Sequence, residues 1–449
     1  MNFSFKEFLA LEVNPALGCT EPVAVALAAS AAAGLLPSRS PEHINVRVDG
    51  NVFKNGLAVM IPGTAGRRGL DLAAALGAVA GDSGRAMQVL ECLSPQQVEQ
   101  AADLVSSNRV EVDLDPDQPG LFIQAEVTVG QNTARALIQG AHDSIVDLSL
   151  NGRKISDSPL LEHEQDANSS NTHHGVHHLE TWLKEQSLAS LLALLKQADD
   201  QDLAFLRQGV DMNLKLAEFG LAHASGLGVG RALADMAEEK TLHKDMLLAA
   251  KIWTAAAADA RMAGAGLPAM SSAGSGNNGL TAILPIWAAG EFLDCPEKTL
   301  LRAIGLSHLV TAYIKTYTGR LSAVCSCSLA AGAGSAAGLA YALGGDEQCI
   351  TRAVNNVIED LGGVLCDGAK TGCALKLATA AGSAVQAALL AHRGVGAVPV
   401  EGILGQTPEQ SIAHLGRLCR EGMTQTGSTI LDIMLGKRKT GNALKFQIP

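Results

Sequence analysis

Aromatic side chains and uninterrupted apolar runs are both scarce in this sequence. Phe, Trp and Tyr make up only 3% of the 449 residues, whereas hydrophobic residues of all kinds make up 47%. A core with so few large rings must be built largely from small aliphatic side chains, which lets helices pack closely. The apolar stretches at 22–36 and 377–391 fall short of about eighteen uninterrupted residues or contain Ser and Gln, so we expect no membrane-spanning helix.

Basic residues are outnumbered, at 34 against 45 acidic ones, and the formal net charge is −11. An acidic chain repels phosphate backbones and anionic lipid, which argues against nucleic acid and membrane surfaces as partners. The N-terminus also lacks the basic start and apolar core of a signal peptide, and nine cysteines, an odd number, do not suggest a disulfide framework. We therefore expect a cytoplasmic protein.

Several common catalytic motifs are missing as well. The sequence contains no Gly-x-Ser-x-Gly, His-Glu-x-x-His or Walker segment. Nothing marks a Schiff-base lysine, so we expect no pyridoxal phosphate. The remaining candidates for chemistry are cysteines and segments rich in glycine and small polar residues.

The hydrophobic pattern changes along the chain. Residues 1–160 combine helical segments with alternating segments typical of strands, whereas residues 179–449 show helical periods throughout. We predict an α+β N-terminal domain, a polar linker over 161–178, and an all-α, Ala/Gly-rich helical domain. In the first domain we expect helices at 21–33 and 70–79, a polar turn at 49–56, and strands at 44–48, 57–61, 110–114, 122–129, 134–138 and 145–150.

The expected linker contains two histidine pairs, His173-His174 and His177-His178. Paired imidazoles can bind zinc. No cysteine or compact carboxylate site adjoins them in the sequence, so we interpret this segment as a solvated loop.

The most informative stretch runs from Asp360 to Leu377. Cys366 and Cys373 stand seven positions apart in it, with two glycines between them and Lys370 and Lys376 close by. Glycines let the backbone turn tightly, and nearby lysines favour thiolates. The alternative is a pair of buried, inert cysteines.

Other cysteines precede predicted helices. Cys325 and Cys327 form a second close pair about forty residues upstream of Cys366, ahead of an Ala/Gly-rich helix. Cys19 stands just before the helix at 21–33, where the positive end of the helix dipole favours a thiolate. The alternative for Cys19 is the role of a small buried hydrophobic residue.

Small polar residues near helix starts and turns suggest anion-binding sites. Segment 271–279 combines hydroxyls, amides and glycines ahead of a helix, whose first N–H groups suit a carboxylate. The loop at 61–66 and the turn at 49–56 are further candidates, although turn chemistry alone also explains such residues. The candidate substrate-binding residues are Thr20, Asn51, Lys54, Thr64, Ser271, Ser272, Gly274, Ser275 and Asn277.

Four segments resemble one protein family in chain order: Gly18-Cys19-Thr20-Glu21-Pro22, Asp49–Gly56, Ser271–Gly279 and Cys366-Asp367-Gly368-Ala369-Lys370. They are similar to the L-cysteine desulfidase family, which is related to the iron–sulfur L-serine dehydratases, and the likeness extends over essentially the whole chain. The resemblance implies an oxygen-sensitive [4Fe-4S] enzyme that converts L-cysteine to pyruvate, ammonia and sulfide without pyridoxal phosphate.

A catalytic cluster needs one iron without a protein ligand, so three cysteine ligands are expected. Cys366 and Cys373 are the first two. The third is Cys325 or Cys327, which face different ways if they lie on a helix, and resemblance to the serine dehydratase pattern favours Cys325.

Cys19 is the first choice for the base that removes the Cα proton of L-cysteine, and Lys370 or Lys376 is the alternative. The same cluster chemistry could instead dehydrate L-serine, with hydroxide leaving in place of sulfide. A non-enzymatic redox or sulfide sensor would use the same cysteines without turnover. A homo-oligomer is compatible with the sequence.

Overall fold

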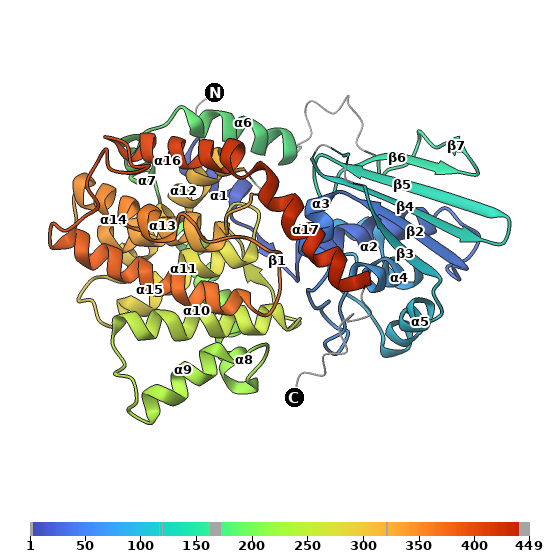
Figure 1. The fold of residues 1–449 in the computed structure, drawn as a ribbon, viewed down its shortest axis with the longest axis horizontal. Helices are drawn as coiled ribbons and strands as arrows, with labels where there is room; N and C mark the ends of the chain where they lie inside the picture. Colours follow the sequence, from blue (N-terminus) through green and yellow to red (C-terminus); the bar gives the residue numbers. More distant parts are fainter. Residues whose placement is uncertain (1–2, 116, 119, 162–171, 320–321, 440–449) are drawn as a thin grey trace. The chain divides into compact units, whose positions relative to one another are not determined.

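The computed structural model describes residues 3–115, 117–118, 120–161, 172–319 and 322–439 (Figure 1). The chain divides into two compact units. The helical unit comprises Met1–Gly18, Gln165–Cys366 and Lys370–Arg420. The sheet unit comprises Cys19–Glu164, Asp367–Ala369 and Glu421–Pro449. Each unit thus consists of several segments that are separate in the sequence.

The sheet unit has an α+β fold, as predicted, around a six-stranded mixed sheet. The strand order is β3-β2-β4-β5-β6-β7, with β2 and β3 parallel and the other neighbours antiparallel. Burial alternates along β2, as expected for a sheet covered on one face. The strands are β2 (His43–Val48), β3 (Val110–Leu114), β4 (Phe122–Val129), β5 (Asn132–Gln139), β6 (Ile145–Leu150) and β7 (Arg153–Lys154).

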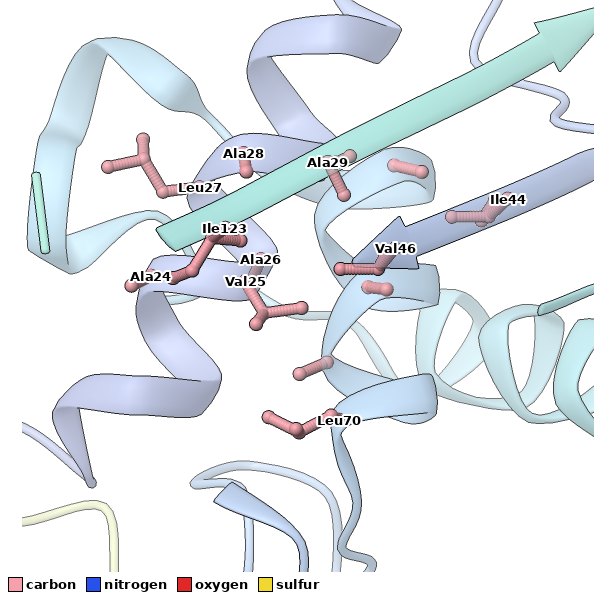
Figure 2. Packing of buried hydrophobic residues seen from close by; sticks show 14 of the residues in the cluster. Ala24, Val25, Ala26, Leu27, Ala28, Ala29, Ile44, Val46, Leu70 and Ile123 are labelled. Atoms are coloured by element: carbon pink, nitrogen blue, oxygen red, sulfur yellow. The ribbon is translucent and has the colours of Figure 1, made fainter. Parts of the chain in front are cut away.

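Helices α2 (Thr20–Ala33) and α4 (Leu70–Ala80) pack together, and both contact the sheet. Figure 2 shows alanines of α2 beside Ile44 and Val46 of β2 and Ile123 of β4. Alanine side chains permit this close packing because they occupy little space between backbones. Small aliphatic side chains therefore fill this core in place of aromatic ones. The other helices of this unit are α3 (Gly50–Gly56), α5 (Pro95–Ser106) and α17 (Thr424–Lys439).

Two local predictions in the sheet unit are wrong. The segment 49–56, predicted as a turn, contains helix α3, because Asp49 caps it by accepting hydrogen bonds from the N–H groups of Asn51 and Val52. The segment 57–61 is not a strand, since only Met60 forms a bridge, with Arg68. Its apolar side chains are buried in a loop, and a short apolar run does not distinguish these cases.

We expect Gly77→Ala to destabilise the protein by about 3 kcal/mol, because a Cβ at this position would lie 2.1 Å from the carbonyl oxygen of Ala26. Urea unfolding followed by circular dichroism measures the change. Gly427→Ala in α17 is the matched control, because nothing lies within 4 Å of its added Cβ. Equal stability of the two variants would contradict the close packing of α2 and α4.

The helical unit is largely α-helical, with one short ladder between β1 (Pro15–Ala16) and β8 (Ala269–Met270). This ladder explains why the first residues of the chain belong here. Its helices are α1 (Phe5–Glu12), α6 (Thr172–Lys184), α7 (Leu188–Leu195), α8 (Asp200–His223), α9 (Val229–Glu238), α10 (Met246–Met262), α11 (Gly276–Gly290), α12 (Glu297–Thr318), α13 (Ser326–Ala342), α14 (Glu347–Leu361), α15 (Cys373–His392) and α16 (Pro408–Arg417).

Helix α6 replaces the second part of the predicted linker. Residues 162–171 lie outside the described residues, but the loop predicted for 172–178 is wrong. Leu179 and Leu183 are fully buried one turn apart, and this apolar stripe stabilises a helix despite the polar sequence before it. His177 and His178 therefore lie on a helix.

Within the described residues, only α15 is long and apolar enough to cross a membrane. Its most apolar window contains the Ser and Gln noted in the sequence and is 56% buried inside the protein. Core helices of soluble proteins have the same properties, so this helix is weak evidence for a membrane span.

Candidate functional site

The two cysteine pairs come together because their segments run side by side in the helical unit. Val324 and Leu365 form an antiparallel bridge. The N–H of Cys325 donates to the carbonyl of Val364 at 2.7 Å, and the N–H of Cys366 donates to that of Ala323 at 2.8 Å. Segments forty residues apart are thus joined by backbone hydrogen bonds beside the cysteines.

Both cysteine pairs also adjoin helix starts. Cys325 is the N-cap of α13, and Cys373 is the first residue of α15, which packs against α13. Cys327 and Cys373 pack against one buried cluster that includes Leu377. The positive ends of two helix dipoles therefore lie beside both cysteine segments.

Electrostatic coupling places the four thiols in one neighbourhood. A hydrogen bond from Cys327 lowers the pKa of Cys325 to about 6, and the charge of Lys376 contributes. The same bond and burial raise the pKa of Cys327 well above its usual value, and repulsion from Cys373 and Cys366 adds to this rise. Four such sulfurs cannot all be charged together without a compensating cation, which is the usual property of a metal-binding group.

The members of the Cys325–Cys327 pair differ in their surroundings. Cys325 is buried and accepts a hydrogen bond from Ser328 Oγ at 3.3 Å. Cys327 is only half-buried, and it is the thiol whose pKa responds to Cys366 and Cys373.

The loop between Cys366 and Cys373 requires glycine at its tip. Gly368 has a φ of +92°, and a Cβ there would lie 2.2 Å from the backbone oxygen of Lys54 within the sheet unit. Past this tip, the N–H of Cys373 donates to the carbonyl of Lys370 at 2.9 Å, and Lys376 Nζ donates to the carbonyl of Leu365 at 2.7 Å. This hydrogen bond from Lys376 joins the first turn of α15 to the residue that precedes Cys366.

Four further cysteines lie apart from this group. Burial raises the pKa of the Cys349 and Cys419 thiols, which disfavours thiolates at both positions. Cys92 is exposed, and Cys295 is partly exposed.

The loop 271–275 before α11 is held in a strained conformation by buried side chains. Ala273 has a φ of +48°, which non-glycine residues seldom adopt. Lys315 Nζ donates to the carbonyl of Ala273 at 2.8 Å, and the Ser272 hydroxyl lies 2.8 Å from His308 Nδ1. His308 and Lys315 stand seven residues apart on one face of α12, so a single helix holds the loop at two points.

His308 was not identified from the sequence. It is completely buried, and burial lowers its pKa to about 3, so its imidazole is neutral at ordinary pH. In the sequence, the seven-residue spacing indicates only that His308 and Lys315 share a face of α12. The partner segment of this face lies about forty residues away in the sequence.

The other side chains of this segment have protein partners as well. Ser271 Oγ accepts from the N–H of Asn14 at 3.3 Å, and Asn277 Oδ1 accepts from Arg261 Nη1 at 2.9 Å. Arg261 also donates to the carbonyl of Gly18 at 2.7 Å. Ser275 is the N-cap of α11 without a side-chain cap bond, and Gly274 has a positive φ of 75°.

The candidates of the sheet unit occupy helix starts and a turn. Asn51 and Lys54 lie on α3, and the Thr64 hydroxyl bonds to the carbonyl groups of Ile61 at 2.7 Å and Arg67 at 3.1 Å. Thr20 is the first residue of α2, and Cys19 is its N-cap. Cys19 is buried and makes no side-chain cap bond.

Comparison with known proteins supports the coarser part of the resemblance, the relationship to the iron–sulfur L-serine dehydratases. The serine dehydratase alpha chain family matches residues 86–432. A "UPF0597 protein" of Desulfatibacillum aliphaticivorans is 51% identical over 98% of this chain and 99% of its own. The corresponding protein of Desulfotalea psychrophila is 50% identical over 98% and 100%, and that of Clostridioides difficile is 41% identical over 95% and 98%. This chain therefore belongs to the serine dehydratase alpha chain family, whose members are in general dehydratase-like lyases that bind a [4Fe-4S] cluster.

Proposed function

We propose that this protein is an L-cysteine desulfidase, which converts L-cysteine to pyruvate, ammonia and hydrogen sulfide by β-elimination. The observation that carries the proposal is the group of four thiols at the starts of α13 and α15. A [4Fe-4S] cluster is the cofactor that thiolates of this kind hold, and the family match agrees with it.

The donor set fits a cluster better than a single ion. Among the described residues, no three His, Cys, Asp or Glu side chains are placed to hold one metal ion. A cluster binds its thiolates at separate irons, so its ligands lie farther apart than those of a single ion. The two helix starts and Lys376 offset the negative charge of the bound thiolates.

For the three ligands we propose Cys366, Cys373 and Cys327. The sequence favoured Cys325 as the third, but Cys327 is less buried than Cys325 and packs against the same buried cluster as Cys373, which supports Cys327. Cys325 is more buried and accepts a hydrogen bond from Ser328. We propose that it stabilises the ligand thiolates without binding iron itself.

A bound cluster, held by Cys366, Cys373 and Cys327, would supply Lewis-acid activation of the sulfur as a leaving group. The base accepts the Cα proton as the Cβ–S bond breaks, which leaves aminoacrylate and sulfide. Hydrolysis of aminoacrylate then gives pyruvate and ammonia. We propose Cys19 as this base, with Lys370 as the alternative.

We propose that the substrate carboxylate binds at the start of α11. Gly274 and Ser275 precede this helix, and the N–H groups of its first turn follow them. Ser271, Ser272 and Asn277 already bind protein groups and position this loop. We retain Thr20, Asn51 and Lys54 as proposed substrate contacts. Thr64 instead stabilises its turn, because its hydroxyl bonds to two backbone carbonyl groups.

L-Serine dehydration is the second candidate, because the matched family is described by serine. We expect anaerobically isolated protein to form pyruvate from both amino acids, with a higher kcat/KM for L-cysteine because iron binds a thiolate more strongly than an alcohol. Pyruvate is measured for each substrate, and sulfide is measured with L-cysteine. A higher kcat/KM for L-serine assigns the dehydratase activity, and no turnover of either substrate by cluster-loaded protein assigns a sensor.

A further inference from the structure

A cavity of about 430 Å³ lies within the helical unit. Its walls come from the end of α6, the end of α12 and the turn after α16, and α12 packs against both other helices (Figure 1). Liquid water occupies about 30 Å³ per molecule, so the space accepts a ligand of several heavy atoms. The described residues that line it include no cysteine.

Positive charge dominates this cavity. Among the described residues that line it, Lys184, Lys315 and Arg420 are basic and Glu180 is acidic. The protein as a whole carries 45 acidic and 34 basic residues, so three cations around one small space run against its average composition. Cations converging on a concave surface concentrate anions.

Hydrogen bonds fix the walls before any ligand arrives. The Tyr317 hydroxyl donates to the backbone carbonyl of Lys184 at 2.9 Å, which joins the ends of α12 and α6. Arg420 Nη1 donates to the backbone carbonyl of Tyr317, which joins the turn after α16 to the same point. Walls held in this way lose little conformational entropy when a ligand binds.

One wall residue connects the cavity with the loop before α11. Lys315 is only 7% exposed, and its Nζ donates to the carbonyl of Ala273 at 2.8 Å. A ligand that attracts this ammonium therefore acts on the loop that we propose for the substrate carboxylate.

We propose that this cavity binds a small multivalent oxyanion, with phosphate or carboxylate groups, separately from the substrate. The charge balance of three cations to one carboxylate accounts for the sign of the ligand. The volume accounts for its size, and the link through Lys315 gives its binding a route to the loop. The proposal does not depend on which amino acid the enzyme cleaves.

Isothermal titration calorimetry on the anaerobically isolated full chain tests this site, with inorganic phosphate and malonate as separate probes at equal ionic strength in potassium chloride. We expect one site per chain for at least one probe, and the probe that binds distinguishes phosphate from dicarboxylate chemistry. Lys184→Glu brings the balance to two cations and two carboxylates, so we expect at least a tenfold loss of affinity. Lys184→Gln should give a smaller loss.

Lys215→Glu is the matched control, because Lys215 is exposed on α8 and does not line the cavity. Its affinity should equal that of the unchanged protein, and circular dichroism checks that all variants are folded. The proposal is overturned if neither anion binds more tightly than about 1 mM. It is equally overturned if Lys184→Glu binds as the unchanged protein does, because the anion then lies elsewhere. Neither result bears on the desulfidase proposal, since calorimetry of these anions requires no turnover.

Discussion

Cys366→Ala and Cys373→Ala are each expected to give folded protein that retains almost no iron after anaerobic purification. Both residues flank the loop at the start of α15, and both act electrostatically on Cys327. Removing one of three thiolates leaves an iron without its protein ligand, and the cluster then loses iron. Iron and acid-labile sulfide per chain measure the effect.

Cys349→Ala and Cys419→Ala are the matched controls, because burial raises the pKa of both thiols and neither acts on the four-thiol group. Their iron content should stay near that of the unchanged protein. Normal iron content in both the Cys366 and Cys373 variants would show that these residues are not ligands.

The same measurement separates the members of the upstream pair. We expect Cys327→Ala to lose the cluster and Cys325→Ala to retain most of it, because Cys327 packs against the same buried cluster as Cys373, whereas Cys325 is buried and accepts a hydrogen bond from Ser328. The reverse result would restore the assignment that the sequence favoured.

Cys19→Ser is expected to retain the cluster and to lose about 10²–10⁴ in turnover, the usual effect of removing a general base. Cys19 is buried at the start of α2, where the helix dipole favours a thiolate, and a serine hydroxyl is too weak a base near neutral pH. Pyruvate formation per cluster gives the rate without interference from iron loss.

Proton exchange gives the sharper test of Cys19. A bound substrate analogue that cannot eliminate should exchange its Cα hydrogen for deuterium in the unchanged protein but not in iron-replete Cys19→Ser. Unchanged exchange in that variant would assign the base elsewhere, with Lys370 next. Loss of iron in Cys19→Ser would instead make Cys19 a ligand.

Regular elements of the fold were largely predictable from the sequence. Strand β2 alternates buried and exposed residues, and β4 alternates buried and half-buried residues from Ile123 to Thr128, so a period of two is visible in the sequence. The errors arose where the local sequence pattern favoured one structure and contacts with distant parts of the chain stabilised another. The segment 57–61 is as apolar as a strand but has no partner strand, and 172–178 is as polar as a loop but leads into the buried stripe of α6.

Long-range partners of the candidate site were beyond sequence reasoning. Ser272 was identified from its loop, but its partner His308 lies 36 residues away, and only packing brings the two together. The same holds for Arg261, which binds Asn277 and also donates to the carbonyl of Gly18, 243 residues away. The cysteines were easier to identify, because each pair is close in sequence and adjoins a helix start.

We expect turnover of L-cysteine to require a cluster held by the thiols at the starts of α13 and α15. The most direct measurement compares pyruvate formation by anaerobic protein, by the same protein stripped of iron by a chelator, and by stripped protein rebuilt with iron and sulfide. We expect turnover to vanish with the iron and to return on rebuilding, except in Cys373→Ala. Full turnover by iron-free, air-exposed protein would show that the reaction does not require the cluster.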